Sequence, residues 1–216
     1  MQTSPRYKVV IVDPSYSLNQ TMGHYRTYDE GLAESFRESG LGVLILGRMN
    51  YENRSEVLES GIEVRSALNY DIWENPLFPN EKSKLSPEEE LQTQLELIST
   101  EAAITPLHFI FTNATNFQIR TALKFLNSLK VTDSITLILR YHIDLYRYSE
   151  LFTSFDEFSG LVKAGKIKIA TDSAILKEQM RQFLGGMEIE VLPVPNRFTP
   201  TRKIRPKQEG KFVVSS

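Results

Sequence analysis

Polar residues suited to binding a ligand or moving a proton stand in three places, each beyond an apolar run. The runs 7–13, 108–112 and 135–139 are strand-length and mostly apolar, which is typical of buried parallel strands. Parallel strands end at one edge of their sheet, and open α/β sheets bind ligands there. We therefore expect a single site at that edge. Its candidate residues are Gly23, His24, Tyr25, Arg26, Asn113, Arg140, Tyr141 and His142.

The first group, Gly23 to Arg26, lies between a strand and a helix. Gly23 lets the backbone approach a ligand, and the helix that begins near Tyr25 directs free amides and a positive dipole end toward a phosphate. This group suits a phosphate or an acidic or hydroxylated ligand, with His24 and Arg26 facing the cleft. A plain strand-to-helix turn with solvated side chains is an equal alternative, because one glycine is no fingerprint. The dinucleotide glycine pattern and the phosphate-loop lysine motif are both absent, which excludes the usual hydride-transfer and nucleotide-hydrolysing enzymes.

Three ionisable residues, one of them already among the candidates, stand at the ends of strands. His142 closes the run 135–139 at the ligand edge, which indicates a catalytic residue; the alternative is a strand-end histidine bonded to a neighbour. Asp13 ends the first strand, but the third strand lacks the aspartate that a receiver-like acidic pocket requires. His108 begins its strand and is expected to be structural. No histidine and carboxylate cluster has metal-ligand spacing, so we expect no metal.

Composition restricts the function classes further. The chain has 216 residues, a formal net charge of -2 and a sequence pI near 6.0, so its charge gives no reason to expect a nucleic-acid partner. It contains no cysteine, no charged-then-apolar leader and no apolar run long enough to span a membrane. We therefore expect a cytoplasmic protein.

Strands and helices alternate along the chain, which predicts a Rossmann-like α/β fold. The expected sheet is open and mostly parallel, with about seven strands and helices on both faces. Ser86, Pro87 and Glu89 predict a helix start, whereas 55–59 resembles a short helical stretch. The expected strands are 7–13, 43–46, 62–64, 108–112, 135–139, 167–171 and 189–192, and the expected helices are about 25–39, 87–103, 117–126, 154–163 and 173–184.

Two stretches do not fit this alternation. Loop 67–84 is irregular and carries Trp73 and Phe78, which we expect near the acceptor side of the cleft. Residues 199–216 are basic and proline-punctuated like a linker, yet they end in a strand-like run. We therefore expect one domain over 1–198, then a linker and the first-strand stub of an absent second domain. The alternative is a disordered tail with a chance apolar patch.

Four motifs follow one another in chain order: a glycine loop with the first helix, a strand ending in a histidine and an acid, a strand-serine-helix segment, and a strand that enters a proline-asparagine turn. They occupy 23–43, 137–144, 169–176 and 191–196. In this order they resemble the amino-terminal domain of GT-B glycosyltransferases. The resemblance is to the retaining, glycosyltransferase family 4-like enzymes, which include sucrose and glycogen synthases.

The resemblance implies the acceptor-side half of an enzyme that transfers a sugar from a nucleotide-sugar donor to a sugar or glycan acceptor. It implies that His142 contacts the donor sugar, that Gly23 and its neighbours flank the diphosphate, and that no metal, cofactor or protein nucleophile takes part. A second Rossmann-like domain of the parent chain would complete the cleft, so we expect this chain alone to be inactive. The alternative, from another class, is a non-catalytic α/β ligand-binding or assembly module.

Overall fold

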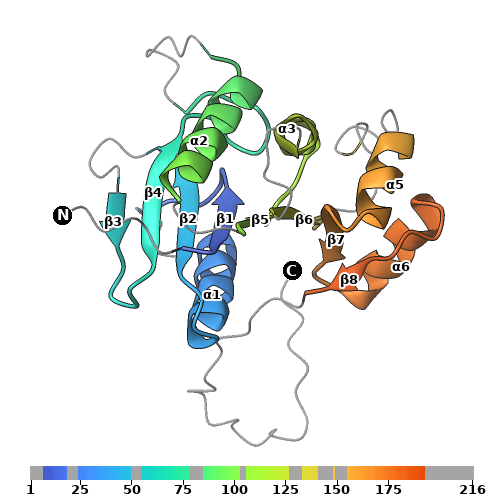
Figure 1. Ribbon diagram of the computed structural model, residues 1–216, viewed down its shortest axis with the longest axis horizontal. Helices are drawn as coiled ribbons and strands as arrows, with labels where there is room; N and C mark the ends of the chain where they lie inside the picture. Colours follow the sequence, from blue (N-terminus) through green and yellow to red (C-terminus); the bar gives the residue numbers. More distant parts are fainter. Residues whose placement is uncertain are drawn as a thin grey trace, which may run out of the picture.

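The computed structural model describes residues 7–18, 24–49, 55–77, 85–102, 106–126, 133–140, 148 and 155–192. Eight strands form one open sheet in the order β3-β4-β2-β1-β5-β6-β7-β8, and five described helices accompany it (Figure 1). The strands are β1 (Val9–Asp13), β2 (Val43–Arg48), β3 (Ser55–Val57), β4 (Glu63–Leu68), β5 (His108–Phe111), β6 (Ser134–Ile138), β7 (Ile167–Thr171) and β8 (Glu190–Val191). The helices are α1 (His24–Glu38), α2 (Pro87–Glu101), α3 (Asn116–Leu126), α5 (Phe155–Lys163) and α6 (Ala174–Phe183).

The predicted fold class is confirmed. All neighbouring strands run parallel except β3 and β4, so the sheet is mixed but mostly parallel. The predicted start of α2 is also confirmed: the Ser86 side chain accepts a hydrogen bond from the Glu89 amide, and the Glu89 carboxylate accepts one from the Ser86 amide.

The prediction of a helical stretch at 55–59 is wrong, and the sheet has an eighth strand there. Ser55–Val57 forms β3, which pairs antiparallel with β4 at one edge of the sheet. A turn reverses the chain between the two strands, with Gly61 at a φ of 80°. A few residues make too few hydrogen bonds to sustain an isolated helix, whereas the hairpin pairs the same residues with a strand already in the sheet.

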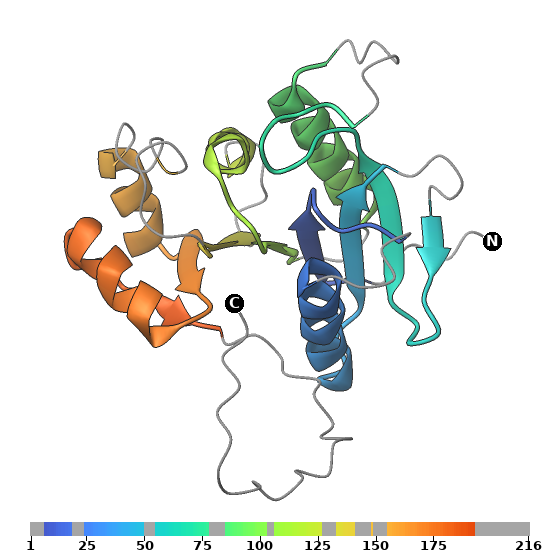
Figure 2. The same ribbon diagram turned by 180° about the vertical axis from the view of Figure 1, so that it is seen from behind.

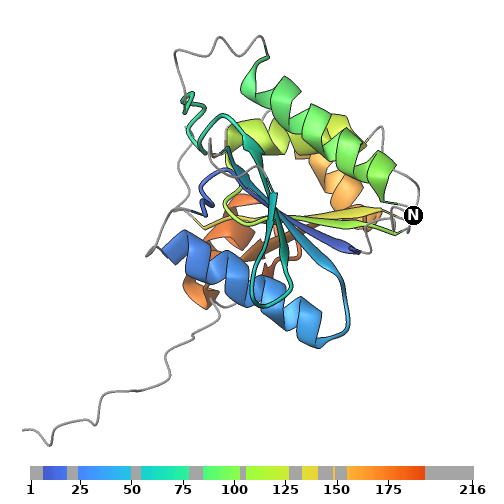
Figure 3. The same cartoon turned by 90° about the vertical axis from the view of Figure 1, so that its left-hand side faces the viewer.

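Helices cover both faces of the sheet. The smaller apolar cluster contains Tyr28 and Ala33 of α1, and the larger contains buried side chains of α2, α3, α5 and α6. Alternate residues of each central strand enter opposite clusters; for example, Val9 and Ile11 belong to the smaller and Val10 to the larger. Figure 3 shows α1 and α2 on opposite sides of the sheet.

The chain order reverses direction between β1 and β5. From β1 the chain builds outward to β2 and β4, then returns to place β5 on the other side of β1 and continues outward to β8. Figure 2 shows β1 between these two halves, with α1 beside it. Open α/β sheets bind ligands at such a reversal, outside the carboxyl ends of the strands. The fold therefore places a candidate site beyond Asp13 and Phe111.

Several predicted features lie outside the described residues. They include the expected linker and strand stub at 199–216 and the second half of the irregular loop, with Phe78. Among the helices that are described, none combines the length and the apolar composition that crossing a membrane requires.

Candidate functional site

Four adjacent strands each end in a polar side chain at the carboxyl edge of the sheet. Asp13 is the last residue of β1, Asn113 and Arg140 stand two residues beyond β5 and β6, and Asp172 follows β7. The Asn113 Nδ2 donates to Asp13 Oδ2 at 2.6 Å, and Arg140 Nη1 donates to Asn113 Oδ1 at 3.1 Å. Arg140 Nε donates to Asp172 Oδ2 at 3.3 Å. A continuous polar chain therefore crosses the point where the strand order reverses.

The Arg140 guanidinium is the cation at the centre of this chain. Its Cζ lies 4.4 Å from the ring centroid of Tyr28 and 5.9 Å from that of Tyr25, so two aromatic rings of α1 contact it. Its side chain is only 10% exposed. Among the described residues, no acceptor is placed against Nη2. The guanidinium is thus held in one orientation with a donor left for a carboxylate or phosphate oxygen.

A second carboxyl group, Asp29 of α1, faces Asp13, and both residues are fully buried. Burial raises the pKa of Asp13, although hydrogen bonds from Asp29, from the Ser15 amide and from Asn113 oppose the rise. Burial, together with the neighbouring Asp13 carboxylate, raises the pKa of Asp29 well above its usual range. Two carboxylates in contact cannot easily both ionise in an apolar surrounding, and the pKa is raised further for Asp29 than for Asp13.

Other buried polar atoms around Asp29 lack partners. Neither Asp29 oxygen accepts a hydrogen bond from a donor in the described part of the chain, and the Tyr28 hydroxyl and Thr112 Oγ1 have no bonded partner there either. Thr112 lies beside Asp29. Buried polar groups are nearly always paired, so several unpaired ones at the strand-order reversal make this region a candidate for a functional site.

The sequence analysis missed Asp29 altogether and set Asp13 aside. The signal for Asp29 is a charged residue within the apolar face of a helix, because Ala33 and Phe36 follow it at helical spacing. A receiver-like pocket would take its second aspartate from the third strand, whereas the partner of Asp13 comes from α1. Asp172 was not selected either.

The structure brings three of the predicted site residues together, because Tyr25, Asn113 and Arg140 meet at the carboxyl edge. Arg26 makes other contacts: its Nε donates to Glu30 Oε1 at 2.7 Å and its Nη1 to the Leu18 carbonyl at 2.8 Å. The first bond lies within α1, and the second fastens α1 to the loop that follows β1.

The remaining predicted residues are not placed. His24 begins α1, but its side chain lies outside the described residues, as do Gly23, Tyr141 and His142 entirely. Their roles, including catalysis by His142, stay predictions.

His108 lies at the opposite, amino edge of the sheet. Its Nδ1 is 2.6 Å from Ser134 Oγ and its Nε2 is 2.9 Å from Thr136 Oγ1, both on β6. Burial, aided by Lys168, lowers the pKa of His108 to about 4. A neutral imidazole with a hydroxyl group at each nitrogen connects two strands, as a structural residue does.

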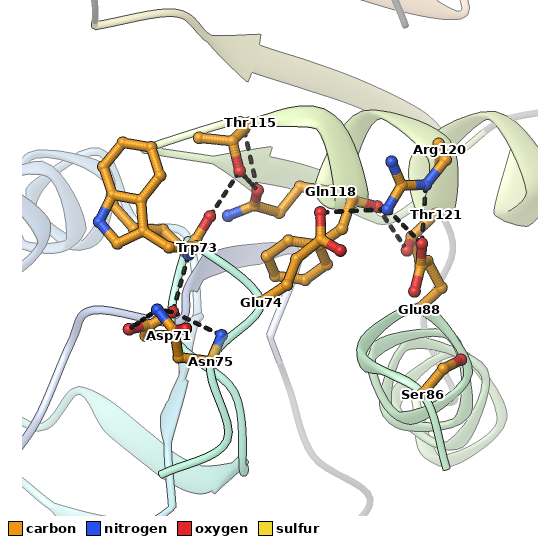
Figure 4. Close-up of polar contacts among 12 residues, drawn as sticks. Asp71, Trp73, Glu74, Asn75, Ser86, Glu88, Thr115, Gln118, Arg120 and Thr121 are labelled. Atoms are coloured by element: carbon orange, nitrogen blue, oxygen red, sulfur yellow. Dashed lines mark hydrogen bonds and ion pairs between the residues drawn. The ribbon is translucent and has the colours of Figure 1, made fainter. Parts of the chain in front are cut away.

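Loop 69–77 follows β4 and also lies at the carboxyl edge. Figure 4 shows its polar contacts. Asp71 Oδ1 accepts hydrogen bonds from the backbone amides of Trp73 and Asn75, at 2.8 and 3.0 Å. Thr115 Oγ1, in the turn between β5 and α3, donates to the Ile72 carbonyl at 2.8 Å. The loop is thus closed by its own aspartate and fastened to the turn that follows β5, while the Trp73 side chain is 41% exposed.

An ionic contact fastens the same loop to two helices (Figure 4). Arg120 of α3 donates to Glu74 at 3.1 Å and is also paired with Glu88 of α2. Glu74 has a φ of 66°, in the left-handed region that residues other than glycine seldom adopt. A strained position persists only where its surroundings fix it, so this loop is held firmly in place.

No protein-family model matches the chain, and no curated protein resembles it closely enough to match. Within the described residues, no group of three or more histidine, aspartate and glutamate side chains is arranged to hold a metal ion. The function must therefore be argued from the site itself.

Proposed function

We propose that this chain is the acceptor-side domain of a GT-B-type glycosyltransferase and that Arg140 binds the diphosphate of its nucleotide-sugar donor. One observation carries the proposal: a guanidinium fixed by Asn113 and Asp172 presents an open donor at the edge where the strand order reverses. An arginine held in this way matches the geometry of phosphate oxygens. The fold supports the proposal only as far as its class, because a Rossmann-like sheet serves many functions.

The residues around Arg140 have distinct roles in this proposal. Asn113 and Asp172 orient the guanidinium, and the rings of Tyr25 and Tyr28 exclude water from one side of it. Water exclusion strengthens the attraction between the guanidinium and a phosphate because the local dielectric constant falls. His142 is proposed to contact the donor sugar, and a second Rossmann-like domain to supply the other wall of the cleft.

Calorimetric titration of this chain with UDP, GDP and ADP tests the proposal. We expect at least one of these diphosphates to bind, and Arg140→Ala to weaken its binding at least tenfold, about 1.4 kcal/mol, because a charge-assisted hydrogen bond is lost. Arg181→Ala on α6 is the matched control, since it removes the same charge from an exposed pair with Glu178. The proposal fails if no diphosphate binds, or if both variants bind like the wild type.

The same site would serve a non-catalytic ligand-binding module equally well. A transfer assay on the parent protein that carries the expected second domain separates the two. Transfer of the sugar from the nucleotide sugar whose diphosphate binds best supports the enzyme, whereas binding without transfer supports the module.

A further inference from the structure

We propose that Asp13 and Asp29 share one proton and that this proton positions Asn113 and Arg140 for an anionic ligand. Asp29 is then a positioning residue, which acts on the ligand only through its neighbours. The first half of the proposal stands on the buried pair alone, and the second half rests on the proposed function.

The hydrogen bonds show which member of the pair is ionised. Asp13 accepts two, from the Ser15 amide at Oδ1 (2.7 Å) and from Asn113 at Oδ2 (2.6 Å), as a carboxylate does. Asp29 accepts none from the described donors, although both of its oxygens are buried. A carboxylate without donors is costly to bury, whereas a carboxylic acid can donate its proton to Asp13. The proton therefore belongs on Asp29.

The ionised state of Asp13 fixes the orientation of the Asn113 amide. Because Nδ2 donates to Asp13, the amide oxygen must point the other way, and there it accepts from Arg140 Nη1. A rotated amide would present its NH₂ group to the guanidinium, which is also a donor. The order of groups is Asp29, Asp13, Asn113, Arg140, and each bond determines the direction of the next.

Loss of the shared proton would place two negative charges in contact between β1 and α1. The groups that face Asp29 are Asp13 of β1, Thr112 beyond β5, Arg140 beyond β6, Tyr16 of the loop after β1, and Tyr28 of its own helix. Repulsion from Asp13 would move α1 away from β1, and α1 carries the two tyrosines that contact the guanidinium. Alternatively, Arg140 would turn toward Asp29 and leave Asn113. Either movement removes the arrangement that presents Nη2 to a ligand.

The pH dependence of stability tests the shared proton without any ligand. Between the ordinary pKa of an aspartate and the raised pKa of Asp29, the folded protein holds one proton that the unfolded chain has released. As the pH rises through this range, the folding equilibrium constant of the wild type therefore falls about tenfold per pH unit, relative to that of a variant without a titrating group at position 29. We expect this difference between wild type and Asp29→Asn in urea unfolding at pH 5, 6 and 7. Asp156→Asn, an exposed position on α5, is the control and should follow the wild type.

A direct measurement on the wild type guards against a variant that fails to fold. The carboxyl carbon of Asp29, followed by NMR, should keep the chemical shift of a protonated acid at pH 6. Titration of Asp29 at the ordinary pKa of an aspartate overturns the proposal. So does a pH dependence of stability that is the same in wild type and Asp29→Asn.

Binding of inorganic pyrophosphate tests the positioning. Asp29→Asn retains an N–H group that can donate to Asp13, whereas Asp29→Ala does not, so we expect pyrophosphate affinity to be kept in the first variant and reduced five- to tenfold in the second. Equal affinity in the two variants overturns the positioning role. If the wild type binds neither pyrophosphate nor a nucleoside diphosphate, the proposed function and the positioning role both fail, while the NMR and stability measurements still decide the shared proton.

Discussion

Two ionisable groups at opposite edges of the sheet, His108 and Asp29, are held in opposite ways. At the amino edge, each ring nitrogen of His108 has a hydroxyl partner on β6, and the group is held neutral. At the carboxyl edge, Asp29 has only another carboxyl group, Asp13, and the hydroxyls nearby lack partners among the described residues. A fully bonded neutral group stabilises the fold and has nothing left to offer a ligand. A buried group with unmet hydrogen bonds lowers the stability of the fold, so we expect such a group to serve a function.

Two arginines repeat this contrast. Arg65 of β4 is paired with two carboxylates, Glu101 at 2.7 Å and Glu63 at 3.7 Å. Arg140 has one carboxylate partner, one amide and two aromatic rings. Arg65 therefore has two carboxylate partners where Arg140 has one, and Nη2 of Arg140 has no acceptor among the described residues. This difference leads us to place the anion-binding site at Arg140.

The largest effect is expected from acidification, because the two edges should respond to it with opposite signs. The pKa of His108 is lowered to about 4 from 6.5, so its contribution to stability is fully present above pH 6.5 and is lost as pH falls toward 4. The loss should reach about 3 kcal/mol at pH 4. The contribution of Asp29 to the free energy of unfolding should instead increase as the pH falls over the same interval.

Urea unfolding of wild type and His108→Gln at pH 7 and pH 4.5 isolates the histidine contribution. We expect the variant to lose less stability than the wild type as the pH falls, because other acid-sensitive groups are common to both. An equal loss in the two proteins would mean that His108 is protonated without cost, and the contrast between the edges would then fail.

An intermediate effect is expected at Gly47, where β2 passes the loop that follows Asp13. A Cβ added there would lie 2.8 Å from Tyr16 Cδ1 and 2.9 Å from the Tyr16 carbonyl oxygen. Gly47→Ala should therefore destabilise the protein by about 1–3 kcal/mol through overpacking. Gly160→Ala is the matched control: it lies within α5 with open space around it, and should be neutral or stabilising by up to about 1 kcal/mol.

Overpacking at Gly47 should also alter the candidate site at the carboxyl edge. The Tyr16 hydroxyl also donates a hydrogen bond to Glu30 of α1 at 3.0 Å. Displacing Tyr16 should therefore shift α1 relative to the sheet and weaken diphosphate binding. Unfolding free energies and diphosphate affinities of the two alanine variants provide the check. A Gly47→Ala protein as stable as Gly160→Ala would show that the carboxyl edge has room to adjust.

The smallest effect on stability is expected at Trp73. Its side chain is partly exposed on a loop that is fastened by other residues, so Trp73→Ala should cost less than about 1 kcal/mol. Trp73 is the only tryptophan in the chain, so its fluorescence reports on this loop alone. We expect that signal to change when an acceptor sugar analogue binds. Binding seen by calorimetry with unchanged fluorescence would make the loop part of the scaffold.

Local patterns were sufficient where short stretches of sequence decide the structure. The capping box at Ser86 lies within one helical turn, and it was predicted correctly. The hairpin of β3 with β4 was not predicted, because a three-residue strand has too little periodicity to distinguish it from a helix turn. Asn113 and Arg140 were selected only as strand-end residues, and no local pattern indicates that they pair with Asp13 or Asp172.

The sequence by itself determined the alternation of strands and helices, and with it a mostly parallel sheet whose polar strand ends share one edge. Only the tertiary structure decided that β5 lies beside β1, which brings Asn113 to Asp13 across 100 residues of chain. It also decided that Asp29 faces Asp13 from α1. The physical reason is that apolar periodicity specifies which face of an element is buried, while the partner on that face is fixed by strand order and helix packing.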